Sequence, residues 1–224
     1  MARLITGLDA GQVRANAERV RGEIDAAARR AGRDPSGVSL LAAVKYVPAE
    51  ELGTLAEAGL GVVGENRAQD LEAKATGPHG EAFAWHFIGQ LQSRKVRQVI
   101  AHAEAIHSLA SDSALEQLLR HGTPETRVLV QVNVAGEEGK AGIAPGELGA
   151  FLERAARGAS PVTGLMTMPP ATDDPDASRR HFAALRELAA EHALAELSMG
   201  TSQDYVVAVE EGATLVRVGS ELYA

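Results

Sequence analysis

The sequence predicts an α/β fold, a single (β/α)8 TIM barrel with an extra N-terminal helix, from three observations. Eight short apolar runs alternate with segments of helical periodicity along the whole chain. Several runs are almost continuously apolar, which is typical of parallel strands covered on both faces. Eight such units in 224 residues fit a compact barrel, and a doubly wound open sheet is the structural alternative. No linker separates two halves, so we expect one domain over residues 1–224.

The predicted helices start near the N-terminus. Over residues 9–31, Val13, Ala17 and Val20 recur on one face with arginines opposite, which predicts the extra helix. The next helix spans residues 48–59, with proline in its first turn and glycine at its end. Further helices are expected at residues 69–75, 92–101, 113–121, 145–157, 176–192 and 203–211.

The predicted strands are the apolar runs themselves. They cover residues 38–44, 60–63, 84–88, 105–109, 128–134, 162–168, 196–199 and 214–218. The stretch GLGVVG at residues 59–64 fits a dinucleotide-binding pattern, but it enters a strand instead of following one. We therefore interpret it as the end of a helix and the start of the next strand.

Composition excludes several classes of protein. The chain carries 30 Asp+Glu against 22 Lys+Arg, a formal net charge of −8, so we expect no nucleic-acid partner. The absence of cysteine excludes disulfide scaffolds, iron–sulfur clusters and thiol nucleophiles. The histidines form no metal-ligand motif, so we expect no metal. No signal-peptide core or membrane-length apolar run is evident, so we expect a cytoplasmic protein without a membrane partner.

Polar residues interrupt the apolar runs mainly where the runs end. Lys45 follows the first run, Asn66 the second and Ser202 the seventh, whereas Arg217 lies within the eighth. The carboxyl ends of the strands form the functional face of a barrel, so we expect the site there.

The last two strand ends carry the segments SMGTS (198–202) and VGS (218–220). Their glycines allow the backbone to approach an anion, and their hydroxyls can donate hydrogen bonds to it. Barrels commonly hold phosphate between the loops after strands seven and eight. The two segments therefore predict a phosphate-binding cup, with ordinary turn chemistry as the alternative. Ser202 is also expected to be the N-cap of the helix that follows.

Two cationic side chains indicate which kind of phosphorylated ligand the cup would bind. Lys45 ends a very apolar strand, so we expect it in the barrel mouth, where lost hydration favours a neutral, nucleophilic amine. A solvated strand flank is the alternative. Arg217 interrupts the apolar run LVRVG, where an unpaired guanidinium is costly, and an ion pair with Glu65 is one alternative.

A lysine that takes an aldehyde, a phosphate cup and a buried cation together describe a pyridoxal 5′-phosphate (PLP) site. A guanidinium only donates hydrogen bonds, so a ring nitrogen beside Arg217 stays unprotonated. The cofactor is then a weaker electron sink, which disfavours demanding carbanion chemistry.

Several segments of the chain also resemble a known family. The motifs AVKYVPAEEL, GENRAQDL, WHFIGQLQSRK, QVNVAGEEGKAGI, GLMTMP and LSMGTSQDYVVAVEEGATLVRVGSELY resemble the YggS/PROSC family of pyridoxal phosphate homeostasis proteins. The match runs in order from about residue 40 to the C-terminus. It departs from many relatives beside Lys45, at Val44 and Tyr46, and at Gln90, but neither departure removes a group that the cofactor needs.

The resemblance implies a barrel of the alanine racemase N-terminal type and PLP held on Lys45. It implies a role in vitamin B6 homeostasis and amino-acid balance without catalysis, and PLP-dependent apo-enzymes as recipients; we expect a monomer. The implied cofactor-binding residues are Lys45, Asn66, His86, Met166, Ser198, Met199, Ser202, Arg217, Gly219 and Ser220.

Two other functions remain open on the sequence. A PLP-dependent amino-acid racemase of low activity needs a second acid/base opposite Lys45. Tyr46 adjoins Lys45 and is expected to point the other way along the strand, which disfavours it as that group. A cofactor-free phospho-sugar aldolase or isomerase would also suit a lysine beside a phosphate cup, although no carboxylate pair accompanies Lys45.

Overall fold

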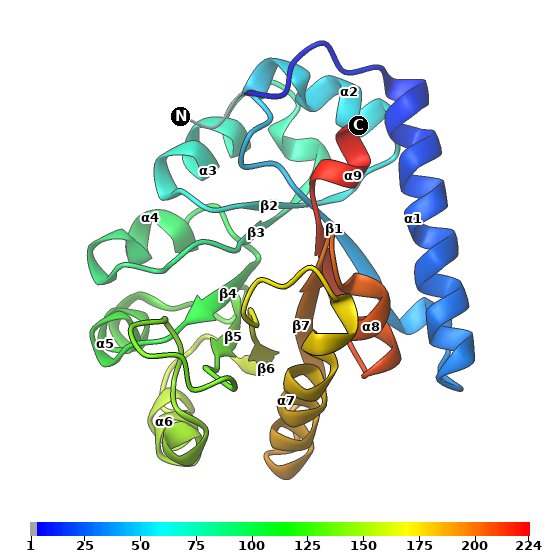
Figure 1. The fold of residues 1–224 in the computed structure, drawn as a ribbon. Helices are drawn as coiled ribbons and strands as arrows, with labels where there is room; N and C mark the ends of the chain where they lie inside the picture. Colours follow the sequence, from blue (N-terminus) through cyan, green and yellow to red (C-terminus); the bar gives the residue numbers. More distant parts are fainter. Residues whose placement is uncertain (1–3) are drawn as a thin grey trace.

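The computed structural model describes residues 4–224, which fold around a closed parallel barrel (Figure 1). Each strand pairs in parallel with the next, and the eighth pairs with the first, which excludes the open sheet. The strands are β1 (Ser39–Ala43), β2 (Val62–Glu65), β3 (Ala84–Phe87), β4 (Ala105–Leu109), β5 (Arg127–Gln131), β6 (Val162–Met166), β7 (Glu196–Thr201) and β8 (Leu215–Val218).

Helices surround the barrel on its outside, as βα crossovers require. They are α1 (Ala10–Arg30), α2 (Leu52–Glu57), α3 (Ala68–Ala75), α4 (Val96–Ile100), α5 (Asp112–His121), α6 (Leu148–Ala155), α7 (Arg179–Glu191), α8 (Tyr205–Glu210) and α9 (Ser220–Tyr223). Short 3-10 turns occupy Pro35–Gly37, Ala49–Glu51, Gly80–Ala82, Ser93–Lys95, Pro145–Glu147 and Pro175–Ser178.

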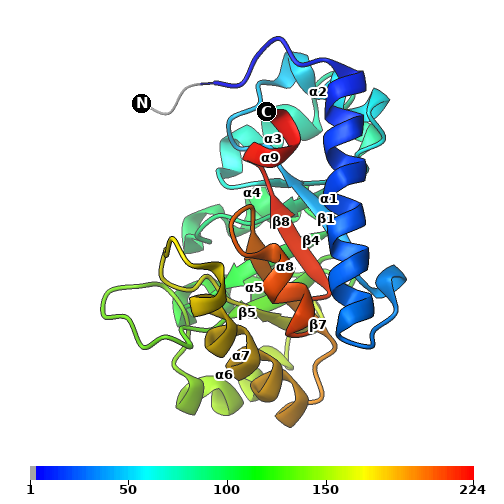
Figure 2. The same cartoon turned by 45° about the vertical axis from the view of Figure 1, so that its right-hand side comes forward.

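The extra N-terminal helix is confirmed. Asp9 caps α1 by accepting a hydrogen bond from the backbone N–H of Gln12, and the predicted apolar face is buried. The helix packs along α8 and α9 on one side of the barrel (Figure 2). Asn16 of α1 also donates to the backbone oxygen of Ala224, so the helix holds the end of the chain.

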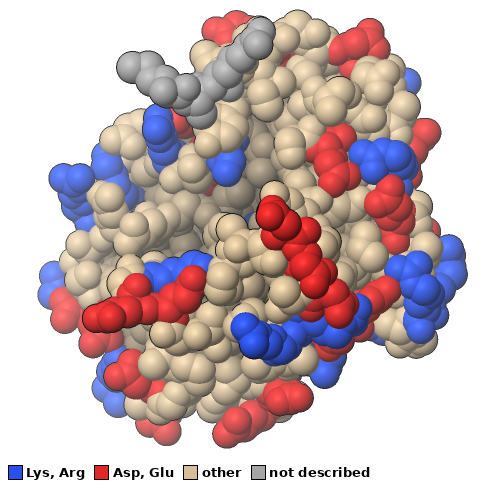
Figure 3. Space-filling view, viewed as in Figure 1, with Lys and Arg blue, Asp and Glu red and all other residues tan. Residues whose placement is uncertain are grey.

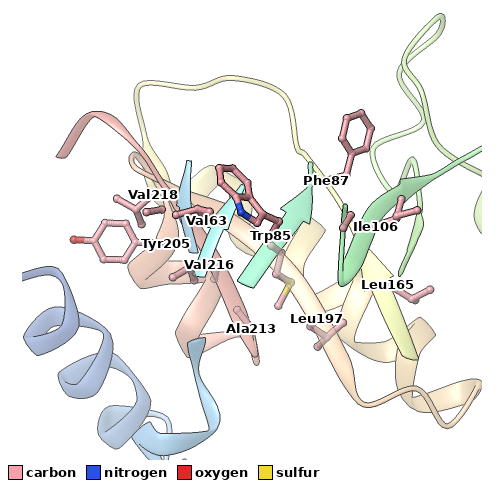
Figure 4. Close-up of a cluster of buried hydrophobic side chains, with 14 of the residues drawn as sticks. Val63, Trp85, Phe87, Ile106, Leu165, Leu197, Tyr205, Ala213, Val216 and Val218 are labelled. Carbon is pink, nitrogen blue, oxygen red and sulfur yellow. The ribbon is translucent and has the colours of Figure 1, made fainter. Parts of the chain in front are cut away.

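Side chains of β3, β7 and β8 alternate between two environments. Trp85, Phe87, Leu197, Val216 and Val218 belong to the apolar layer between barrel and helices (Figure 4). The intervening residues of these strands therefore face the barrel interior. That interior is partly polar, because it receives His86, Ser198 and Arg217, all of them buried.

One buried ion pair lies on the outer side of the barrel. Glu65, at the end of β2, is fully buried, and its Oε1 lies 2.5 Å from Lys74 Nζ of α3. Lys74 Nζ also donates to the backbone oxygen of Val44 at 2.8 Å, while Glu65 Oε2 accepts the backbone N–H groups of Asn66 and Arg67. The pair thus links the chain just after β1 to the chain just after β2.

None of the helices formed by residues 4–224 combines the length and the hydropathy of a membrane-spanning segment.

Removal of one partner of the buried Glu65–Lys74 ion pair should destabilise the fold. Lys74→Met leaves the Glu65 carboxylate buried without its cation, and the free energy of unfolding should fall by about 3–5 kcal/mol. Urea unfolding measures the loss, with Lys95→Met as a surface control expected to stay within about 0.5 kcal/mol. The double variant Glu65→Gln/Lys74→Met should recover much of the stability. Equal losses in single and double variants would contradict the argument.

Acid should weaken the fold through His86. Burial lowers the pKa of His86 from its usual 6.5 to about 4. Between these two values the unfolded chain binds more protons than the folded one, so stability falls as pH falls. His86 accounts for a loss of about 2 kcal/mol between pH 7 and pH 5. Urea unfolding at both pH values checks this, and His86→Gln should lose correspondingly less. An unchanged pH dependence in the variant would refute it.

Candidate functional site

A cavity of about 480 Å³ opens at the carboxyl ends of the strands. Its wall comes from both ends of the chain and from the loops after several strands, and the molecule is visibly hollowed near the middle of this face (Figure 3). The cavity brings together six of the ten predicted site residues, namely Lys45, Asn66, Ser202, Arg217, Gly219 and Ser220. The cavity therefore opens at the face where the sequence predicted the site.

Lys45 lies in the turn after β1, and its exposed side chain lines the cavity. The expectation that it is desolvated is wrong, because β1 ends at Ala43 and the turn lies at the solvent boundary. The expectation that Tyr46 points away is also wrong, since strand alternation does not extend into a turn. Lys45 Nζ lies 5.1 Å from the centre of the Tyr46 ring, and both side chains line the cavity.

Backbone contacts hold the Lys45 turn on two sides. The N–H of Val47 and the ammonium of Lys74 both donate to the backbone oxygen of Val44. On the other side, the N–H of Ile5 donates to the backbone oxygen of Tyr46 at 2.9 Å. The lysine is thus presented from an anchored turn.

Arg217 lies at the base of the cavity and is buried. Its Nη1 donates to Ser198 Oγ at 2.5 Å and its Nη2 to the backbone oxygen of Thr167 at 3.0 Å. Burial lowers the pKa of Arg217 to about 10, so the guanidinium remains charged at neutral pH. The alternative of an ion pair with Glu65 is wrong, because Glu65 lies on the other face of the barrel wall and pairs with Lys74.

The loops after β7 and β8 are joined to each other. Ser202 Oγ accepts the backbone N–H of Gly219 at 3.1 Å. Gly200 has φ +91° where the β7–β8 register shifts, and a Cβ there would lie 2.6 Å from the Cβ of Ala208, so only glycine fits. The two loops therefore form one continuous wall of the cavity.

The expectation that Ser202 caps the following helix is wrong. The helix begins later, at Tyr205, with Asp204 at the N-cap position. Asp204 Oδ1 accepts both the backbone N–H and the hydroxyl of Thr201, which closes a turn before the helix. The Ser202 hydroxyl is left free for the contact with Gly219.

Several wall residues were not among the predicted site residues, and Gly89, Tyr223 and Ile5 are examples. Gly89 lets the chain just after β3 approach the chain just after β2, because a Cβ there would lie 1.9 Å from the backbone oxygen of Asn66. Tyr223 of α9 lines the cavity, and its hydroxyl donates to the backbone oxygen of Ala43 at 3.3 Å. Ile5 of the N-terminal segment lines it too. A four-residue helix such as α9 shows no periodicity, so no sequence signal marked Tyr223.

Four predicted site residues do not line the cavity, although all four are buried: His86, Met166, Ser198 and Met199. The Met199 side chain belongs to the apolar layer outside the barrel, so only its backbone is available to a ligand. Ser198 Oγ lies between Arg217 Nη1 and His107 Nδ1, the latter at 2.8 Å. His107 in turn contacts His86. Ser198 and His86 thus support Arg217 from inside the barrel.

The chemistry of the cavity suits a phosphorylated aldehyde with a basic ring nitrogen. It offers one amine at Lys45, one guanidinium at Arg217, and a wall with the hydroxyl of Ser220. Neither the N–H of Gln203 nor that of Ser220 has a protein acceptor within the described part of the chain. Free amides and hydroxyls on a glycine-containing wall can donate to a phosphate. No cluster of three metal-ligating side chains occurs in residues 4–224.

Comparisons with known proteins identify the family. The family "Alanine racemase, N-terminal domain" matches residues 10–224. The pyridoxal phosphate homeostasis protein of Aquifex aeolicus is 39% identical, over 92% of this chain and 94% of that protein. The corresponding protein of Pseudomonas aeruginosa is 38% identical, over 93% of each chain.

Solved structures extend the comparison. PipY of Synechococcus elongatus with PLP bound is 30% identical with a TM-score of 0.79, and the match covers 95% of this chain and all (100%) of that chain. An alanine racemase from Corynebacterium glutamicum, at 17% identity and a TM-score of 0.69, shows the fold alone, and 63% of that longer chain is covered. This chain therefore belongs to the pyridoxal phosphate homeostasis protein family and carries the alanine racemase N-terminal domain.

Proposed function

We propose that the chain is a single PLP-binding domain over residues 1–224 that holds the cofactor as a Schiff base on Lys45. In this proposal it serves intracellular PLP homeostasis and amino-acid balance as a carrier without catalysis. The observation that carries the proposal is the shared cavity of Lys45, Arg217 and the β7 and β8 loops. The PLP-bound structure of the related PipY supports it.

Lys45 is the best-placed amine for the cofactor aldehyde. The chain has four lysines, Lys45, Lys74, Lys95 and Lys140. Lys74 is buried in its ion pair, Lys95 lies outside this cavity and bonds to Gln98, and Lys140 pairs with Glu137. Lys45 Nζ would hold the cofactor, which when bound would supply an aldehyde that condenses with an amine with loss of water. The bond is reversible by hydrolysis, as a carrier requires.

The β7 and β8 loops would hold the phosphate. The exposed hydroxyl of Ser220 and the N–H groups of Gln203 and Ser220 are donors without protein acceptors in the described range. The tie between Ser202 and Gly219 keeps these donors on one surface. A preorganised wall of this kind binds a phosphate dianion without losing much loop entropy.

Arg217 would meet the ring nitrogen, and this contact argues against catalysis. A guanidinium donates hydrogen bonds but keeps its protons. The ring nitrogen beside it would therefore stay unprotonated, whereas an acidic partner would share a proton with it. When bound, the cofactor supplies an aldehyde and a ring that withdraws electrons, and an unprotonated ring withdraws them weakly.

A PLP-dependent racemase of low activity is the second candidate, and the place of Tyr46 in the cavity is the observation that favours it. Racemisation needs acid/base groups on opposite faces of the substrate carbon, whereas Tyr46 lies beside Lys45. Burial raises the pKa of Tyr223, which makes that phenol a poor base. We therefore favour the carrier, acting as a monomer in the cytoplasm with PLP-dependent apo-enzymes as recipients.

Borohydride reduction of the protein loaded with PLP should place one adduct on Lys45. Wild-type protein should show a visible absorption band that Lys45→Ala lacks, because no other lysine lines the cavity. Peptide mapping by mass spectrometry identifies the modified residue. Lys95→Ala and Lys140→Ala are matched controls and should keep both band and adduct.

An adduct spread over Lys95 and Lys140, or no band in wild-type protein, would overturn the carrier proposal and favour a phospho-sugar enzyme. Amino-acid racemisation by the loaded protein that is lost in Tyr46→Phe would favour the racemase instead.

Ser220→Ala should weaken PLP binding by about tenfold, the cost of one hydrogen bond to a charged group. Pyridoxal, which lacks the phosphate, should bind wild type and variant equally. Equilibrium titration by absorbance or fluorescence gives both affinities. Ser36→Ala, at an exposed turn remote from the cavity, is the control and should change neither. An equal loss for both ligands would show that Ser220 does not contact the phosphate.

A further inference from the structure

We propose that His107 is a positioning residue: it accepts from Ser198 and donates to His86, and so completes a chain of hydrogen bonds that ends on Arg217. This chain of hydrogen bonds orients the Arg217 guanidinium so that its remaining N–H groups face the cavity. Only one part of the inference rests on the proposed function: the assignment of these Arg217 N–H groups to the ring nitrogen of PLP.

The chain crosses the barrel interior from β3 to β8. His86 Nδ1 lies 2.9 Å from His107 Nε2, and His107 Nδ1 lies 2.8 Å from Ser198 Oγ. Ser198 Oγ lies 2.5 Å from Arg217 Nη1. His107 and Ser198 are fully buried, and His86 and Arg217 are almost so, at 3% and 5% exposure. The three hydrogen bonds that join these four side chains are therefore shielded from bulk water.

The direction of the chain follows from Arg217. A guanidinium can only donate, so Ser198 Oγ accepts from Nη1. The hydroxyl hydrogen of Ser198 then has one neighbouring acceptor in the chain, Nδ1 of His107. His107 Nδ1 must therefore be unprotonated, which places the ring hydrogen on Nε2. That hydrogen is donated to Nδ1 of His86.

The reverse direction is disfavoured. If His107 carried its hydrogen on Nδ1, Ser198 would accept from both neighbours, and its own hydrogen would be buried without an acceptor. A doubly protonated His107 would in addition place a second cation beside Arg217. The groups that face His107 electrostatically are His86, Arg217 and Arg127, none of them anionic, and burial keeps the pKa of His107 well below its usual range.

Two fixed donors determine the plane of the guanidinium. Nη1 is held by Ser198, and Nη2 by the backbone oxygen of Thr167. Because the group is planar and rigid, these two contacts define where its other N–H groups point. Without the His107 acceptor, the Ser198 hydroxyl would be free to rotate. Ser198 Oγ would then no longer be fixed as the acceptor of Arg217 Nη1.

The first test uses the protein alone. Nitrogen-15 NMR of histidine side chains at pH 7 should show His107 neutral, with its hydrogen on Nε2, and His107→Gln identifies the signal. A His107 that carries its hydrogen on Nδ1, or that is doubly protonated, would overturn the inference. This measurement is made without the cofactor, and its result does not depend on a change in the stability of the protein.

The second test asks whether the chain orients Arg217. PLP and its 1-deaza analogue, in which carbon replaces the ring nitrogen, are titrated into each variant. Wild type should prefer PLP by at least about tenfold, because only PLP accepts from Arg217. His107→Gln, which keeps an acceptor, should retain this preference, whereas His107→Leu should reduce it to less than about threefold.

An undiminished preference in a folded His107→Leu, verified by circular dichroism, would refute the positioning role. If wild type forms no Lys45 adduct with either compound, the proposed function fails, and the NMR result still decides the hydrogen-bond chain.

Discussion

The architecture of the site depends on one constraint, the burial of the Arg217 cation without a carboxylate partner. A buried guanidinium must be satisfied by acceptors, and here the acceptors are a serine hydroxyl and a backbone oxygen. The hydrogen-bond partners are neutral and only the nearby Asp204 carboxylate offsets the charge in part, so the positive charge remains available to a ligand in the cavity. The polar barrel interior, with His107 and His86 behind Ser198, follows from the same requirement.

Closure of the barrel brings the remaining parts of the site to this cation. The β1–β8 pairing places the turn that carries Lys45 beside the loop of Gly219 and Ser220. The buried Glu65–Lys74 pair holds that turn from outside the barrel wall. Rigid strands thus supply the positions, and short anchored turns supply the reactive groups. Because its turn is anchored in this way, Lys45 has a defined position although its side chain is exposed.

Much of this arrangement was predictable from the sequence, and the errors at Lys45, Tyr46 and Ser202 share a cause. Strand and helix positions followed from periodicity, and the cavity contains most of the residues expected at strand ends. The errors concern turns: Lys45 and Tyr46 lie beyond the end of β1, and Ser202 precedes a turn that Asp204 closes. Alternation and capping rules apply inside regular elements, so they cannot place side chains one or two residues beyond an end.

The sequence by itself determined the barrel, its extra helix and the face on which the cavity opens, because apolar periodicity and strand-end polarity are local properties. Only the tertiary structure decided the partners of the buried charges. It pairs Glu65 with Lys74 on one face of the wall and gives Arg217 neutral acceptors on the other. It also brings Tyr223 from the last helix to the cavity. Such pairings join residues far apart in the chain, and no local pattern specifies which side chains meet across a closed sheet.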